Sequence, residues 1–128
     1  MTDTSIAGPM RSSLDGRTVL VTGAGGFIGS GEAGWLDRSP IRKDIDVRRG
    51  DLADRDSVFD AVRGTDLVFH LGALIAIPYS YLAPESYVRT NILGTLNVLQ
   101  AVRELEIGRL VHTSTSEVYG SAQSVPMT

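Results

Sequence analysis

A glycine-rich segment placed directly after a short apolar run constrains this chain more than any other feature. Residues 17–21 read RTVLV, which predicts a buried strand, and residues 22–29 read TGAGGFIG. Gly23, Gly26 and Gly29 follow the G-x-x-G-x-x-G spacing. The first glycine permits a tight turn, the second lets a pyrophosphate approach the backbone, and the third lets the next helix pack on the strand. Amides at the start of that helix would hold the anion, so the segment predicts a dinucleotide site.

Two other interpretations of this segment were considered. A P-loop needs a lysine followed by serine or threonine after its last glycine, whereas Gly29 is followed by Ser30 and Gly31. That class of site is therefore excluded. An ordinary glycine turn is the remaining alternative, and the strands expected further along the chain disfavour it.

The rest of the chain predicts strands that alternate with helices. In chain order, we expect a candidate strand at 45–47, a helix at 54–63, a strand at 66–71, a long helix at 84–105 and a strand starting at 109–112. Such alternation favours parallel strands joined by right-handed crossovers, with ligands at the carboxyl ends of the strands. The expected fold class is α/β, a Rossmann-like parallel sheet with flanking helices.

Both predicted helices carry apolar residues at helical spacing. Asp54 suits the cap before the shorter helix. Its residues expected to face inward are Val58, Phe59 and Val62. Along the longer helix, the apolar positions at helical spacing are Val88, Ile92, Leu96, Leu99 and Val102. Each helix is therefore expected to present one apolar stripe.

Composition excludes several classes of function. The net charge is −3 without a visible basic patch, which argues against a nucleic-acid partner. Cysteine is absent, and the two histidines are too few for an obvious metal cluster, so no metal site is predicted. No apolar run reaches the ~18 residues of a membrane span. Residues 1–16 are polar and predict a flexible tail, and a cytoplasmic location is expected.

The glycine pattern resembles that of the extended short-chain dehydrogenase/reductase superfamily, which includes the NAD-dependent epimerases and dehydratases. Gly50-Asp51-Leu52 is similar to the segment that holds adenine, where Asp51 would bond the amino group. A turn or helix cap is the alternative role for Asp51. The segment at 70–73, His-Leu-Gly-Ala, resembles the HLAA segment beside the cofactor, with Gly72 in place of the usual alanine. For His70, a structural role at the strand end is favoured over a catalytic one.

This resemblance implies NAD as the cofactor and a set of residues around it. The expected cofactor-binding residues are Gly23, Gly26, Phe27, Ile28, Gly29, Asp51, Leu52, Leu71, Gly72, Ala73 and Thr113. Several of them directly follow predicted strands. NAD and NADP are not distinguished, because no acid could be assigned to the ribose hydroxyls.

Residues 114–120, STSEVYG, resemble a segment of the nucleotide-sugar 4,6-dehydratases, above all those acting on UDP-N-acetylhexosamines. The resemblance implies a nucleotide-sugar substrate and a catalytic set at this segment. Thr115 would bond the C4 oxygen, and Glu117 would be the base at C5. Ser116 stands where glucose-specific relatives carry an aspartic acid. The alternative is a polar loop with local backbone hydrogen bonds and a solvated carboxylate.

The chain departs from this family in two places. The family uses a Tyr-x-x-x-Lys pair, but Lys43 is the one lysine here and Ser39 stands four residues before it. Between Gly29 and Asp44 there is also too little sequence for a helix and a second strand. We therefore expect an internal deletion of roughly thirty residues between about Gly29 and Gly34, by comparison with a complete unit. The first crossover helix and second strand would be missing, and 17–128 would form a partial domain without a substrate domain.

Three functional hypotheses follow from the resemblance. The first is a nucleotide-sugar 4,6-dehydratase by ancestry that is inactive as this isolated chain. A fragment of a nucleotide-sugar 4-epimerase is the second, although Glu117 favours dehydration. The third is a non-catalytic remnant or NAD-binding module. Family members are usually dimers through helices that include the one expected at 84–105, so the resemblance also implies a homodimer through this helix.

Overall fold

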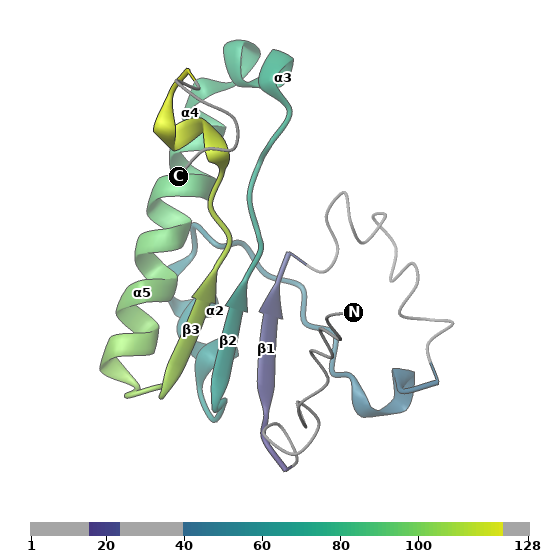
Figure 1. Cartoon of the computed structure of the whole chain (residues 1–128). Coiled ribbons are helices and arrows are strands. Elements are labelled where there is room, and N and C mark those ends of the chain that lie inside the picture. Colours follow the sequence, from purple (N-terminus) through teal and green to yellow (C-terminus); the bar gives the residue numbers. More distant parts are fainter. Residues whose placement is uncertain (1–15, 24–39, 122–128) are drawn as a thin grey trace, which may run out of the picture.

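Three short parallel strands form one sheet in the part of the chain that the computed structural model describes, residues 16–23 and 40–121. β1 spans Val19–Thr22, β2 spans Leu67–His70 and β3 spans Arg109–His112. The strand order is β1-β2-β3, and all three strands point the same way (Figure 1). The sheet confirms the predicted Rossmann-like α/β class, and the predicted strands at 17–21, 66–71 and 109–112 are present.

The helices also follow the predicted order. Their bounds are Arg42–Asp44 (η1, a 3-10 turn), Arg55–Val62 (α2), Ile77–Leu82 (α3), Pro84–Tyr87 (α4), Val88–Leu93 (η2), Gly94–Glu104 (α5) and Ser116–Tyr119 (η3, a 3-10 turn). Asp54 caps α2 as expected, because its side chain accepts hydrogen bonds from the amides of Asp56 and Ser57. The predicted helix at 84–105 is continuous through α4, η2 and α5, but its middle part, η2, is a π-helix.

The core lies between one face of the sheet and the helices α2 and α5. Its buried members are Val58, Val62, Val68, Val98 and Ala101. Neighbouring strands add the half-buried Leu20 and Leu110, which are in register with Val68. Figure 1 shows both helices running along the strands of this sheet. The inward orientation predicted for Val58 and Val62 is confirmed, and Phe59 packs against the same cluster.

The buried face of the long helix is not the stripe of large apolar residues found in the sequence. Val88, Ile92, Leu96 and Leu99 are exposed, and the residues of α5 that are buried are Gly94, Asn97, Val98 and Ala101. The reason is close packing. A Cβ at position 94 would lie 2.8 Å from the Cβ of Leu52. Small side chains let this helix approach its neighbours, so these four larger apolar residues face outward. Val102, the fifth residue of the predicted stripe, packs against the core.

The prediction of a strand at 45–47 is wrong. Residues 45–50 have no regular secondary structure, and Val47 is exposed. Two apolar residues with charged residues on either side bury too little surface to order a strand. Instead, the Arg48 side chain pairs with the Asp46 carboxylate at 2.8 Å. Among the described residues, β2 is the one strand that pairs with β1, so this doubly wound sheet is incomplete.

The sheet face away from α2 and α5 carries a second apolar row. Because side chains alternate across a strand, Val21, Phe69 and Val111 point away from the face that holds Val68. Val21 and Val111 remain exposed, and Phe69 is half-buried. A complete sheet of this class carries helices on both faces, so this row marks the face that a crossover helix would cover.

Two further exclusions hold within the described residues. None of the helices there has the length and apolar character required to cross a membrane. No group of three or more histidine or acidic residues is arranged to hold a metal ion in this part of the chain.

Candidate functional site

Three strand ends meet at one edge of the sheet. Thr22, His70 and His112 are in register as the last residues of their strands. Directly after them come Gly23, the segment 71–73 and Thr113. Parallel sheets bind ligands at this edge, which therefore brings together the predicted cofactor residues that the structure describes. Gly26, Phe27, Ile28 and Gly29 lie outside the described residues.

Two glycines touch at this edge. Gly23 has a φ of +79°, in the left-handed region that favours glycine. A Cβ there would lie 2.6 Å from the Cα of Gly72 and 2.9 Å from the carbonyl carbon of Leu71. A Cβ at Gly72 would in turn lie 2.7 Å from Cδ1 of Leu52. Position 23 therefore requires glycine, because its φ is left-handed and the atoms in the way belong to the backbone. At position 72 an added Cβ would have to displace the end of the Leu52 side chain.

Asp51 and Leu52 lie on the loop that leads into α2. The Asp51 carboxylate is exposed, and its Oδ1 accepts a hydrogen bond from the Ala53 amide at 2.9 Å. Such a hydrogen bond is typical of a turn, which is the alternative role considered for Asp51 besides binding adenine. Leu52 is fixed more firmly, because its carbonyl accepts a hydrogen bond of 2.9 Å from Asn97 Nδ2. The loop is thus held beside the glycine pair, with the Asp51 side chain in solvent.

Polar side chains of the long helix, which the sequence analysis did not identify, tie the site together. The Asn91 carboxamide bonds both the amide and the carbonyl of Leu74, at 2.8 and 2.9 Å. Thr95 bonds His70, and Asn97 bonds Leu52 as above. The available signal was a group of small polar residues, Asn91, Thr95 and Asn97, in the middle of the helix. Their hydrogen bonds hold two segments in place, the one that follows β2 and the one that precedes α2.

His70 is buried, with a side chain 1% exposed. Its Nδ1 lies 2.7 Å from the Thr22 hydroxyl and its Nε2 lies 3.0 Å from the Thr95 hydroxyl. The His112 ring stacks on it at 5.2 Å between centroids. Burial lowers the pKa of His70, and the neighbouring His112 lowers this pKa further. These contacts support the structural role that the sequence favoured.

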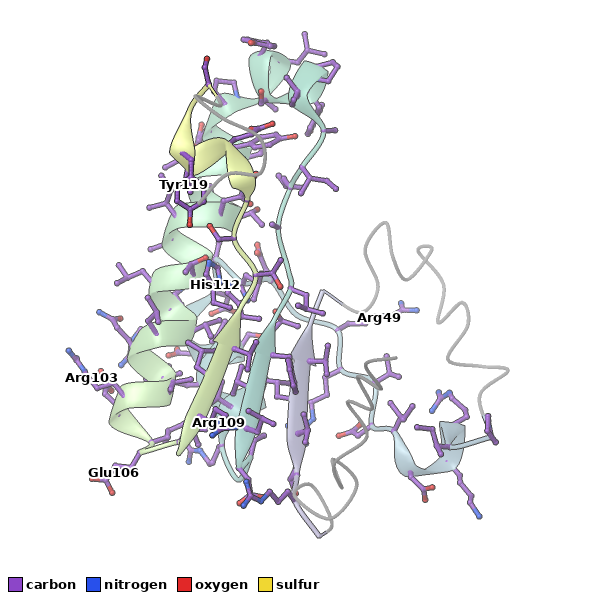
Figure 2. All side chains as sticks on the ribbon, viewed as in Figure 1. Arg49, Arg103, Glu106, Arg109, His112 and Tyr119 are labelled. Atoms are coloured by element: carbon purple, nitrogen blue, oxygen red, sulfur yellow. The ribbon has the colours of Figure 1, made fainter. Side chains whose placement is uncertain are left out.

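The predicted catalytic segment follows β3. Thr115 caps η3, and its Oγ1 accepts a hydrogen bond from the Glu117 amide at 3.2 Å. Both side chains are exposed, and the side chain of Ser116 is outside the described part of the chain. Figure 2 shows His112 at the end of β3 and Tyr119 further along, beyond the edge where the strands end. The hydrogen bond between Thr115 and the Glu117 amide is the kind of local backbone contact that the alternative, a polar loop without a catalytic role, predicts.

A parallel α/β sheet with touching glycines at its strand ends defines a Rossmann-like domain. Comparison with known proteins places it more narrowly: the chain belongs to the GDP-mannose 4,6 dehydratase family, whose model matches residues 31–128. It is 37% identical to a dTDP-glucose 4,6-dehydratase of Streptomyces niveus, over 80% of this chain and 39% of that protein. It is 42% identical to a 2-alkyl-3-oxoalkanoate reductase of Stenotrophomonas maltophilia, over 78% of this chain and 34% of that protein.

Solved structures agree with the fold. A UDP-N-acetylglucosamine 4-epimerase from Methanobrevibacter ruminantium M1, in complex with UDP-N-acetylmuramic acid, matches 88% of this chain and 42% of its own with a TM-score of 0.74 at 28% identity. MoeE5, in complex with UDP-glucose and NAD, matches 84% of this chain and 40% of its own with a TM-score of 0.65 at 31% identity. The family is therefore supported by sequence and by fold.

The chain spans about two fifths of the length of these proteins or less. The alignment with the Streptomyces niveus enzyme has 131 positions but uses 80% of the 128 residues here, so about 29 positions lack a residue in this chain. Against the reductase, 114 positions and 78% of the chain leave about 14 such positions. The number of positions that lack a residue in this chain is thus close to thirty for the dehydratase and about half of that for the reductase.

Proposed function

We propose that this chain is the dinucleotide-binding part of an NAD-dependent nucleotide-sugar 4,6-dehydratase, and that it does not turn over substrate by itself. The observation that carries the proposal is the backbone contact between Gly23 and Gly72 at the aligned strand ends. This contact holds the ends of β1 and β2 close together at the place where sheets of this class bind a pyrophosphate. The NAD and UDP-glucose in the MoeE5 structure are consistent with this chemistry.

The residues present fit a dinucleotide. Gly23 would lie against the pyrophosphate, and the exposed Asp51 carboxylate would accept a hydrogen bond from the adenine amino group. The resemblance assigns residues 26–29, which lie outside the described part of the chain, to the same pyrophosphate. The cofactor residues after the strands, Leu71–Ala73 and Thr113, would line the path towards the nicotinamide. When bound, NAD would supply the oxidation at sugar C4 and the return of hydride at C6.

The segment after β3 would serve the sugar. Thr115 Oγ1 accepts a hydrogen bond from the Glu117 amide, which leaves its hydroxyl hydrogen available to donate to the C4 oxygen. The Glu117 carboxylate is exposed and can take the C5 proton, and Ser116 would stand near the leaving hydroxyl. The 128 residues contain no Tyr-x-x-x-Lys pair to drive C4 oxidation, which is why we expect no turnover.

A direct experiment combines binding and product analysis. Circular dichroism first establishes that the chain is folded, and NAD is then titrated into it by calorimetry. We expect saturable binding of NAD, but no 4-keto-6-deoxy sugar by mass spectrometry after incubation with a UDP-N-acetylhexosamine. A 4-keto-6-deoxy product would refute the proposed inactivity, and a C4 epimer would favour the epimerase alternative. A folded chain that binds no NAD would favour a non-catalytic remnant.

We also propose that the chain forms a homodimer through the helix at 84–105. Val88, Ile92, Leu96 and Leu99 form an outward apolar stripe on it, with Ile92 65% exposed. Such a stripe on one surface helix is typical of a helix–helix interface. In a symmetric dimer, the two copies of the stripe would cover each other.

A charge placed within this stripe should separate the copies. We expect Leu96→Glu to weaken self-association about a hundredfold without unfolding the chain, because Leu96 is exposed in the single chain but would be buried by the partner. Sedimentation equilibrium measures the effect, and Lys43→Glu in η1 is the control. A wild-type chain that stays monomeric at about 100 μM would contradict the interface, because its dimer would then have a larger dissociation constant than most stable dimers.

A further inference from the structure

The buried ring of His70 connects the long helix to the glycine pair through one hydroxyl group. Thr22 Oγ1 lies 2.7 Å from His70 Nδ1 and also accepts a hydrogen bond of 3.2 Å from the Gly72 amide. On its other side, the ring bonds Thr95 on α5. A chain of hydrogen bonds therefore runs from α5 through His70 and Thr22 to the backbone that touches Gly23.

The direction of each hydrogen bond follows from the protons available. The Gly72 amide can only donate, so Thr22 Oγ1 accepts from it, and the hydroxyl hydrogen is left to donate to His70 Nδ1. Nδ1 is then the acceptor, and the single proton of the neutral ring is on Nε2, where it is donated to Thr95 Oγ1. The opposite tautomer would leave the Thr22 hydroxyl hydrogen without an acceptor among the described residues.

We infer that His70 is a positioning residue for the dinucleotide: its unprotonated Nδ1 orients the Thr22 hydroxyl, which holds the Gly72 amide against Gly23. The effect on the cofactor rests on the function proposed above. The relay, which is the chain of hydrogen bonds from Thr95 through His70 and Thr22 to the Gly72 amide, does not rest on that function, because it is defined by contacts within the chain. The sequence favoured a structural role for His70 at the strand end, and the relay makes that role specific to the Gly72 backbone.

Protonation of His70 would break this relay. A proton on Nδ1 would point at Thr22 Oγ1, which already accepts from Gly72 and would then have no acceptor for its own hydrogen. The charge would be buried beside His112, which is the titratable group of the described residues that faces His70. The other side-chain contacts of His70, on β1 and α5, are the hydroxyls of Thr22 and Thr95. Burial and His112 both lower the pKa of His70, so the neutral ring persists to lower pH than in an exposed histidine.

Nuclear magnetic resonance of the whole chain tests the relay without cofactor. We expect the ¹⁵N resonance of Nδ1 to be that of an unprotonated imidazole nitrogen, and His70 to titrate at lower pH than an exposed histidine. Protection of the Gly72 amide from hydrogen exchange should be lost in step with the titration of His70. A proton on Nδ1 in the neutral ring, or Gly72 protection that does not follow His70, would overturn the inference.

Variants of Thr22 extend the test to the cofactor. Thr22→Val removes the hydroxyl that bonds both His70 and the Gly72 amide, and it should lower both the protection of Gly72 and the affinity for NAD about tenfold. Thr22→Ser should restore both. Thr90→Val, which removes a half-buried hydroxyl without a hydrogen bond to another described residue, should change neither. Unaltered protection in Thr22→Val would refute the relay, and lost protection with unaltered NAD affinity would refute the positioning role of His70. Failure of the wild-type chain to bind NAD would contradict the proposed function, while the ring and amide data still decide the relay.

Discussion

Gly23→Ala is expected to lower the free energy of unfolding by about 3 kcal/mol and to abolish detectable NAD binding. A Cβ in the left-handed region costs about 1 kcal/mol, and overpacking adds about 1–3 kcal/mol. The added carbon would lie 2.6 Å from the Gly72 Cα and 2.7 Å from the Gly72 nitrogen. These are backbone atoms that cannot rotate away, so β1 and β2 must separate where the pyrophosphate would bind. Urea unfolding and NAD titration measure the two effects.

A matched control separates the clash from the backbone strain. Gly64 has a φ of +77°, but a Cβ there would meet nothing within 4 Å. Gly64→Ala should therefore cost only the conformational part, about 1 kcal/mol, and leave NAD binding unchanged. Equal losses of stability in the two variants would show that the contact between Gly23 and Gly72 does not constrain the site.

Val98→Ala is expected to lower the free energy of unfolding by about 2 kcal/mol. Val98 is 0% exposed in the cluster formed by α2, α5 and β2, so the lost methyl groups would leave a cavity there. The neighbouring Leu99 is 47% exposed. Leu99→Ala should cost about 0.5 kcal/mol or less in the monomeric chain, although it removes more carbon atoms.

Denaturant unfolding at a concentration where the chain is monomeric compares the two variants. The midpoint should fall clearly for Val98→Ala and change little for Leu99→Ala. The reverse order would mean that the helix buries the stripe of large apolar residues noted in the sequence rather than the face of α5 that the structure buries.

Local sequence patterns were sufficient for the order and type of most elements. RTVLV before the glycines predicted β1, and Asp54 before an apolar pattern predicted the start of α2. Both predictions depend on neighbouring residues alone. The glycine pattern also indicated which edge of the sheet carries the site, because a parallel sheet brings its strand ends to one edge.

Contacts between distant residues could not be predicted in this way. The contact of Gly23 with Gly72 and the bond from Thr22 to His70 join segments 48 or more residues apart. The buried face of α5 depends on which helix side chains are small enough to approach Leu52, and not on where the largest apolar residues stand. The strand expected at 45–47 failed because its two apolar residues, with charged residues on either side, bury too little surface to order a strand, although β1 pairs on one side alone among the described residues.

The central claim is that a dinucleotide binds at the carboxyl ends of the strands. Amide chemical shifts recorded during a titration of the folded chain with NAD test it most directly. We expect saturable shifts at Gly23, Gly72 and Thr113, and unchanged shifts at Arg17 and Gly108 near the opposite edge of the sheet. Shifts confined to that opposite edge, or none at any amide at saturating NAD, would contradict the claim.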